Sequence, residues 1–225
     1  MSADATLSRA MPSISQQVPP APARFAHIRR VWDPTLERPL AKLLPGDYYV
    51  TCHDEVIFTV LGSCVSACVR DRKLGIGGMN HFMLPLDRSG GGGLWGDRTD
   101  TSATRYGNVA MDRLVNDILQ LGGHREDLEF KVMGGGNVLD IAMAVGTHNV
   151  QFVRDYLKRE GFAIAAEDLG DNFARKLYYS PKSGKARVKR LTATVNRVVF
   201  EREQSHASDC DTQAAAALRA DAERR

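Results

Sequence analysis

Residues 64–83 have the pattern of a β-hairpin, and an antiparallel pair of this kind limits the folds open to the chain. Two arms of apolar and small residues flank a polar turn that contains Arg72 and Lys73. With these two as the turn residues, Cys64 lies directly opposite His81, where Cβ atoms are about 4.5–5.5 Å apart. The hairpin therefore predicts a thiol facing an imidazole.

A thiol and an imidazole in contact are the minimum equipment for nucleophilic attack on a carbonyl carbon. The thiolate is the nucleophile, and His81 takes the thiol proton and later delivers it to a leaving group. Two alternatives stay open. A β-bulge at residues 77–78 shifts the register, and Cys and His also occur as a buried apolar residue and a hydrogen-bonded polar residue. We predict Cys64 as nucleophile and His81 as base.

Three further residues are candidates for the site. Thr59 lies on the strand that leads to the nucleophile, and we expect it to hold the imidazole in one tautomer. Asn80 is less favoured because neighbouring residues on a strand point to opposite faces. The turn at Gly62 and Ser63 supplies backbone N–H groups for an oxyanion. The Ser63 hydroxyl either adds a bond to that oxyanion or satisfies its own backbone.

The composition excludes several classes of protein. The chain has 225 residues, 43% of them hydrophobic and 25% charged, with a net charge of +3, which suits one globular domain with tails. No basic run contains interleaved aromatic residues, so nucleic acid is not an expected partner. No apolar stretch approaches the roughly 20 residues that span a bilayer, and the N-terminus lacks the apolar region of a secretory signal.

Cysteine usage predicts a reducing compartment. Cys52, Cys64, Cys68 and Cys210 are few and unevenly placed, which favours reduced thiols in the cytoplasm. Cys64 and Cys68 have no matching Cys or His pair downstream, so zinc is not expected. The predicted Cys/His chemistry needs neither a metal nor an organic cofactor.

The chain divides into three parts. Residues 1–45 hold seven of the nine prolines and are expected to form a largely disordered leader, with docking around residues 30–44 as the alternative. Residues 46–200 form the domain, and the charged, Ala-rich residues 201–225 form a frayed helix or a disordered tail. Within the domain, strands are expected near residues 48–50, 56–60, 128–132, 162–169, 176–179, 186–189 and 191–200, and helices near 108–121 and 150–160, the second with Thr147 or Asn149 as its cap.

Two glycine-rich stretches interrupt these elements. Residues 88–96 are expected to be a loop in which Trp95 is a contact residue. Residues 134–137 favour a tight turn that lets the backbone approach another segment closely, with a phosphate cradle as the alternative. Strands joined by hairpins and by crossovers exclude a simple doubly wound sheet. We expect an α/β fold of mixed α+β type, with layered mixed sheets and helices outside.

Five separated motifs occur in the same order as in the CheD family of chemoreceptor glutamine deamidases, and the resemblance covers about residues 46–200. The motifs are LGSCVSAC at 61–68, HFMLP at 81–85, RYG at 105–107, GGGN at 134–137 and AEDLG at 166–170. The resemblance implies a fold similar to the catalytic domain of a deamidating bacterial toxin. It also places the family's Cys and His on Cys64 and His81, and its upstream Thr on Thr59 across a one-residue gap.

The resemblance implies a cysteine-dependent protein-glutamine glutaminase. Members hydrolyse the side-chain amides of particular glutamines on the cytoplasmic helices of chemotaxis receptors, and methyl-ester hydrolysis is also attributed to them. The implied partners are these receptors and a CheC-type phosphatase, in the cytoplasm. The alternative is a non-catalytic adaptor that binds receptors or such a phosphatase. A cysteine peptidase is less favoured, because no substrate groove is evident in the sequence.

Overall fold

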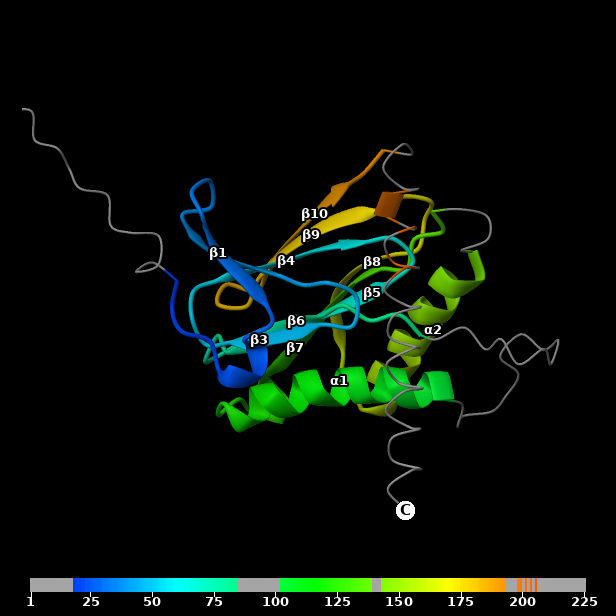
Figure 1. The fold of residues 1–225 in the computed structure, drawn as a ribbon. Helices are drawn as coiled ribbons and strands as arrows, with labels where there is room; N and C mark the ends of the chain where they lie inside the picture. Colours follow the sequence, from blue (N-terminus) through cyan, green and yellow to red (C-terminus); the bar gives the residue numbers. More distant parts are fainter. Residues whose placement is uncertain are drawn as a thin grey trace, which may run out of the picture.

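The computed structural model describes residues 18–84, 102–138 and 143–192, together with 198, 199, 201, 203 and 205; side chains are described from 107 and 145 onward in the two helices. Two five-stranded sheets stack on one another, and two helices cover the outer face of the second sheet (Figure 1). A core of buried apolar side chains joins the layers. This arrangement confirms the predicted mixed α+β fold.

The first sheet forms one outer layer. Its order is β1 (Arg29–Asp33), β2 (Arg38–Lys42), β4 (Val56–Leu61), β9 (Arg175–Ser180) and β10 (Lys185–Arg190). Only β2 and β4 are parallel; the other pairs are antiparallel, including the predicted β9–β10 hairpin.

The expectation of a disordered leader is wrong for β1 and β2. The prediction was based on the high proline content. The two strands are instead held by contacts with residues that are distant in sequence. Ala41 is fully buried, and Arg30 pairs with the buried carboxylate of Glu55. Because a composition rule does not count such contacts, it assigned both strands to the leader.

The second sheet lies between the first sheet and the helices. Its order is β3 (Tyr48–Thr51), β6 (Gly77–Asn80), β5 (Val65–Asp71), β7 (Leu128–Gly134) and β8 (Ile164–Leu169). The helices on its other face are α1 (Ser102–Gln120) and α2 (Met143–Arg159); single 3-10 turns occur at Ala23–Phe25 and Arg125–Asp127. Among the described helices, none has the length and apolar character needed to span a bilayer.

The two helices follow their predicted apolar patterns, but α2 begins earlier than predicted. Met111, Leu114 and Ile118 of α1 are fully buried, as their spacing predicts. The predicted cap of α2 is wrong, because that helix begins at Met143 and Asn149 lies inside it. Asn149 is fully buried, and its side chain hydrogen-bonds to other segments rather than capping the helix.

The register of the β5–β6 hairpin differs from the prediction by two residues. Cys68 pairs with Met79 and Val65 bridges to Phe82, so Cys64 is not directly opposite His81. The loop has four residues, 72–75, because the Asp71 carboxylate accepts the N–H groups of Lys73 and Leu74, both at 2.8 Å. A shift of two residues leaves both side chains on the same face of the hairpin.

The predicted strand at residues 191–200 is wrong where the structure describes it. Val198, Val199, Glu201, Glu203 and Ser205 are helical, and we call these five residues the C-terminal segment. Val199 is buried with Val138 and Ala174, which overrides the strand preference of valine. Trp95 and Cys210 lie outside the described residues.

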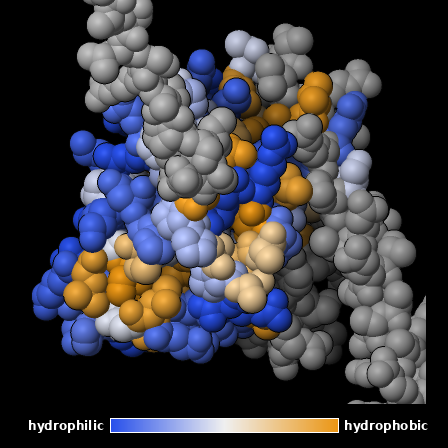
Figure 2. Space-filling model, turned by 60° about the vertical axis from the view of Figure 1, so that its left-hand side comes forward, coloured by the Kyte–Doolittle hydropathy of each residue, from blue (hydrophilic) through white to orange (hydrophobic). Residues whose placement is uncertain are grey.

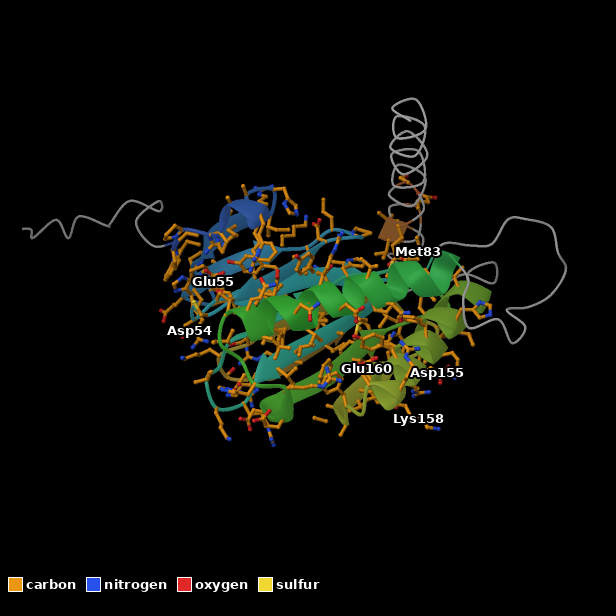
Figure 3. The ribbon with its side chains drawn as sticks, turned by 90° about the horizontal axis from the view of Figure 1, so that it is seen from below. Asp54, Glu55, Met83, Asp155, Lys158 and Glu160 are labelled. Atoms are coloured by element: carbon orange, nitrogen blue, oxygen red, sulfur yellow. The ribbon has the colours of Figure 1, made fainter. Side chains whose placement is uncertain are left out.

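The surface in Figure 2 mixes hydrophilic and hydrophobic residues, with one hydrophobic cluster at the lower left of that face. Figure 3 shows Asp54 and Glu55 at one end of the molecule and Met83 near the other end. Glu55 also accepts a hydrogen bond from the Tyr49 hydroxyl at 2.8 Å, so the buried Arg30–Glu55 pair connects β1 with β3.

Candidate active site

The loop between β4 and β5 carries the predicted nucleophile, and a glycine turn holds its backbone. Gly135 donates its N–H to the carbonyl of Cys64 at 2.7 Å, and Gly136 donates to the carbonyl of Gly62 at 2.8 Å. Gly134 has φ of +115°, and a Cβ there would lie 2.2 Å from the Cys64 carbonyl oxygen. The prediction of a tight turn with close backbone approach is confirmed.

His81 is held on both its backbone and its ring. Its N–H donates to Asp47 and its carbonyl accepts from Gly46, both at 2.8 Å. Thr59 Oγ1 lies 2.7 Å from His81 Nδ1 and 3.0 Å from the carbonyl oxygen of Leu43. Because a carbonyl only accepts, the hydroxyl donates to Leu43 and accepts from Nδ1–H. The neutral ring therefore carries its proton on Nδ1 and presents a lone pair at Nε2.

The structure brings the predicted nucleophile and base together. Cys64 Sγ and a ring nitrogen of His81 lie within 4.8 Å of each other and of a carboxylate oxygen of Glu203. Both side chains are buried. Asn80 points away, as expected, because its Oδ1 accepts the N–H of Ala67 and its Nδ2 donates to Ala110 on α1. A thiol and an imidazole thus lie close together in the interior of the fold.

The predicted oxyanion donors all point to one carboxylate. Gly62 N–H donates to Glu203 Oε1 at 2.7 Å, and the Ser63 N–H and hydroxyl both donate to Oε2 at 2.9 Å. Glu203 belongs to the C-terminal segment and is 1% exposed. The donors at Gly62 and Ser63 therefore form a preorganised anion site next to the thiol.

The environment of Cys64 keeps its sulfur protonated in this arrangement. Burial raises the pKa of the Cys64 thiol well above its ordinary value, and the negative charge and hydrogen bond of Glu203 raise that pKa further. A thiol with a raised pKa is a weak nucleophile. Burial and, to a smaller extent, Glu203 thus both oppose formation of the Cys64 thiolate.

Comparison with known proteins assigns the chain to a family. A family model described as CheD chemotactic sensory transduction matches residues 83–190. A protein of Halorhodospira halophila, named probable chemoreceptor glutamine deamidase CheD, is 49% identical over 196 residues, which cover 87% of this chain and 90% of that protein. The chain belongs to the CheD family.

Two other CheD proteins with the same name support the assignment. The one from Herminiimonas arsenicoxydans is 54% identical over 179 residues, 79% of this chain and 86% of that protein. The one from Hahella chejuensis is 48% identical over 184 residues, 81% of this chain and 84% of that protein. The matches extend over most of each relative.

The sequence analysis did not predict a site role for two residues near the thiol, Asn149 and Glu203. Asn149 on α2 donates from Nδ2 to the Ser63 carbonyl at 2.8 Å and accepts the Leu84 N–H at 2.9 Å. It ties the nucleophile loop to the arm that carries His81. A polar residue on the buried face of a helix was the only signal for Asn149, and an apolar residue four positions earlier was the only signal for Glu203.

In the described part of the chain, two clusters of side chains have atoms that could bind a metal ion. Cys64, His81 and Glu203 offer a sulfur, a nitrogen and an oxygen within 4.8 Å, and these atom types suit zinc. Both oxygens of Glu203 already accept hydrogen bonds from the loop, for which a metal would compete. The second group is Asp71, His124 and Asp127 at the β5–β6 loop.

Proposed function

We propose that this CheD-family protein hydrolyses the side-chain amide of glutamines on chemotaxis receptors, giving glutamate and ammonia. One observation carries the proposal. Two backbone N–H groups and one hydroxyl, from Gly62 and Ser63, converge on a side-chain carboxylate beside Cys64 and His81. The same donors suit the oxyanion that forms when a thiolate attacks a glutamine carbonyl.

The proposed reaction is a double displacement. Cys64 passes its proton to His81 Nε2, and the sulfur bonds to the glutamine Cδ while the carbonyl oxygen becomes an oxyanion. His81 then protonates the nitrogen, the C–N bond breaks, and ammonia leaves a thioester. Water gives a proton to His81 and attacks the thioester, which releases glutamate and restores the thiol. Thr59 keeps Nδ1–H oriented, so Nε2 faces the sulfur in each step.

The proposed partners follow from the receptor substrate. Helices of the receptor cytoplasmic domain present the glutamines, so we place the protein in the cytoplasm. A CheC-type phosphatase is a second proposed partner, supported by the sequence resemblance alone. Calorimetry of the purified protein with that phosphatase tests this second partnership separately.

The test of the reaction follows the mass of a receptor fragment that contains the target glutamines. We expect the wild-type protein to replace an amide NH2 by OH, and Cys64→Ala to abolish this mass change. Cys52→Ala is the matched control, because Cys52 is exposed and in a separate loop. Undiminished conversion by Cys64→Ala would contradict the mechanism. Receptor binding without conversion by the wild-type protein would support the adaptor alternative.

A further inference from the structure

A glutamate side chain is the product of the proposed reaction. Glu203 places such a side chain at the site where that reaction would occur. Its two oxygens accept three hydrogen bonds from Gly62 and Ser63, all of 2.7–2.9 Å. We infer that the active site binds the C-terminal segment of its own chain, with Glu203 as a product-like ligand that competes with receptor glutamines. The competition with receptors rests on the proposed function, but the binding of the segment does not.

A second contact fixes the segment in the same position. Val199 is 8% exposed and packs with Val138 and Ala174. The partly buried side chains of Val60 and Leu191 pack against this cluster. Residues four apart lie on one face of a helix, so Val199 and Glu203 enter the domain together. Glu201 lies on the other face and is exposed. One apolar and one acidic residue thus form the docking face.

The loop accommodates the segment because residue 62 is glycine. A Cβ at Gly62 would lie 2.8 Å from Glu203 Oε2 and 3.2 Å from Val199 Cγ1. Both contacts of the segment therefore converge on the backbone that precedes the nucleophile. The site recognises a helical segment by a carboxylate and by an apolar side chain four residues before it.

Docking of the segment blocks the reaction in two ways. The donors that would hold an oxyanion are used by Glu203, and the Cys64 side chain is fully buried while the segment is docked. The carboxylate also contributes to the raised pKa of the Cys64 thiol. A receptor glutamine must therefore displace the segment first. Because the segment is tethered, its local concentration does not depend on the protein concentration.

The test uses the full chain and iodoacetamide labelling of Cys64, read from peptide masses. Cys52 is exposed and serves as the internal reference in the same molecule. We expect Glu203→Ala to raise Cys64 labelling relative to Cys52 roughly tenfold or more, because charged hydrogen bonds hold the segment. Glu201→Ala is the matched control, since it removes the same side chain from the exposed face, and it should leave labelling unchanged.

Val199→Asp separates docking from the charge of Glu203. This variant keeps the carboxylate but opposes burial of the segment, and we expect it to raise Cys64 labelling as Glu203→Ala does. In kinetics with the receptor fragment, Glu203→Ala should lower KM with little change in kcat. Equal Cys64 labelling in wild-type protein and Glu203→Ala would overturn the inference.

The two proposals fail in different ways. If no variant deamidates the receptor fragment but Glu203→Ala still exposes Cys64, the segment docks and the proposed receptor reaction is wrong. If wild-type protein deamidates the fragment while Glu203→Ala changes neither labelling nor KM, the reaction stands and the docking inference is wrong.

Discussion

Thr59 and His81 are joined by a 2.7 Å contact between Oγ1 and Nδ1, and a second bond from the same hydroxyl to the Leu43 carbonyl fixes its direction. The hydroxyl has one proton, and Leu43 takes it. Nδ1 must therefore be the donor, which leaves Nε2 to accept the proton of the thiol. A backbone carbonyl thus sets the tautomer of the proposed base through an intervening hydroxyl.

Replacing Thr59 by valine should lower kcat about ten- to a hundredfold, with little change in KM, because the ring loses the acceptor that orients it. The Leu43 carbonyl also loses its donor, so we expect a fall of about 1–2 kcal/mol in the free energy of unfolding. Thr59→Ser keeps the hydroxyl and should restore most of the rate. Steady-state kinetics and urea unfolding measure both effects; an unchanged kcat in Thr59→Val would contradict the role.

Replacing Ser63 by alanine should lower kcat roughly a hundredfold, because one of the three anion donors is lost. Ser66→Ala is the matched control. Its hydroxyl is also buried, but it donates to the carbonyl of Asn80 and not to the anion site. We expect Ser66→Ala to affect stability more than rate. Equal loss of kcat in both variants would argue against a special role for Ser63.

Replacing Gly134 by alanine should destabilise the fold by about 3 kcal/mol or more, because the new methyl group meets the Cys64 carbonyl in a left-handed backbone. Gly122→Ala is the control. Gly122 has a similar φ of +100°, but nothing lies within 4 Å of a Cβ there. That variant bears the backbone strain alone, about 1–2 kcal/mol. Chemical unfolding of both variants separates steric collision from strain.

Asp71 should stabilise the protein in a pH-dependent way. Burial raises the pKa of Asp71, but hydrogen bonds from the backbone N–H groups of Leu74, His124 and Lys73 outweigh it, so the net pKa is lowered from 3.8. The carboxylate's contribution is therefore present above pH 3.8 and is lost as the pH falls below it. We expect Asp71→Asn to lose about 1–3 kcal/mol at neutral pH, and less near pH 3. A pH-independent difference in unfolding free energy would contradict this.

Glu203→Gln offers the proposed reaction a substrate within its own chain. If the docked amide reacts, Cys64 displaces ammonia, water cleaves the thioester, and residue 203 becomes glutamate again. We expect the peptide that contains residue 203 to reach the wild-type mass on incubation. The same change in a Cys64→Ala background should keep the glutamine mass. Persistence of the glutamine in both proteins would show that the docked side chain does not reach a reactive position.

Local patterns predicted the elements that build the site. The β-branched and aromatic residues of β4, the alternation of apolar and charged residues in β7 and the 3–4 spacing in α1 are properties of short windows of sequence. The pairing of Cys64 with His81 was predicted from a wrong register, because the four-residue loop depends on the hydrogen bonds of Asp71. The error was two residues, which preserves the face, so both side chains still meet.

Contacts between distant segments account for what the sequence did not predict. Glu203 reaches the N–H of Gly62 across 141 positions, and Asn149 reaches Ser63 across 86. β1 is held against the domain partly because Arg30 pairs with Glu55. The periodicity of a short window of sequence holds no information about contacts between residues so far apart in the chain. Because Glu203 lies inside the fold, a boundary after residue 200 does not separate a tail from the domain.

The four-residue loop at 72–75 limits how this hairpin can change length. Adding or removing two residues there preserves the side of the sheet on which His81 emerges. A change of one residue that shifted the pairing of β6 by one would turn the imidazole toward α1, among the partners of Asn80, unless a bulge compensated. Homologous chains that retain a working base should therefore absorb an odd change of length within the loop itself or carry a bulge, so that the pairing of β5 with β6 is kept.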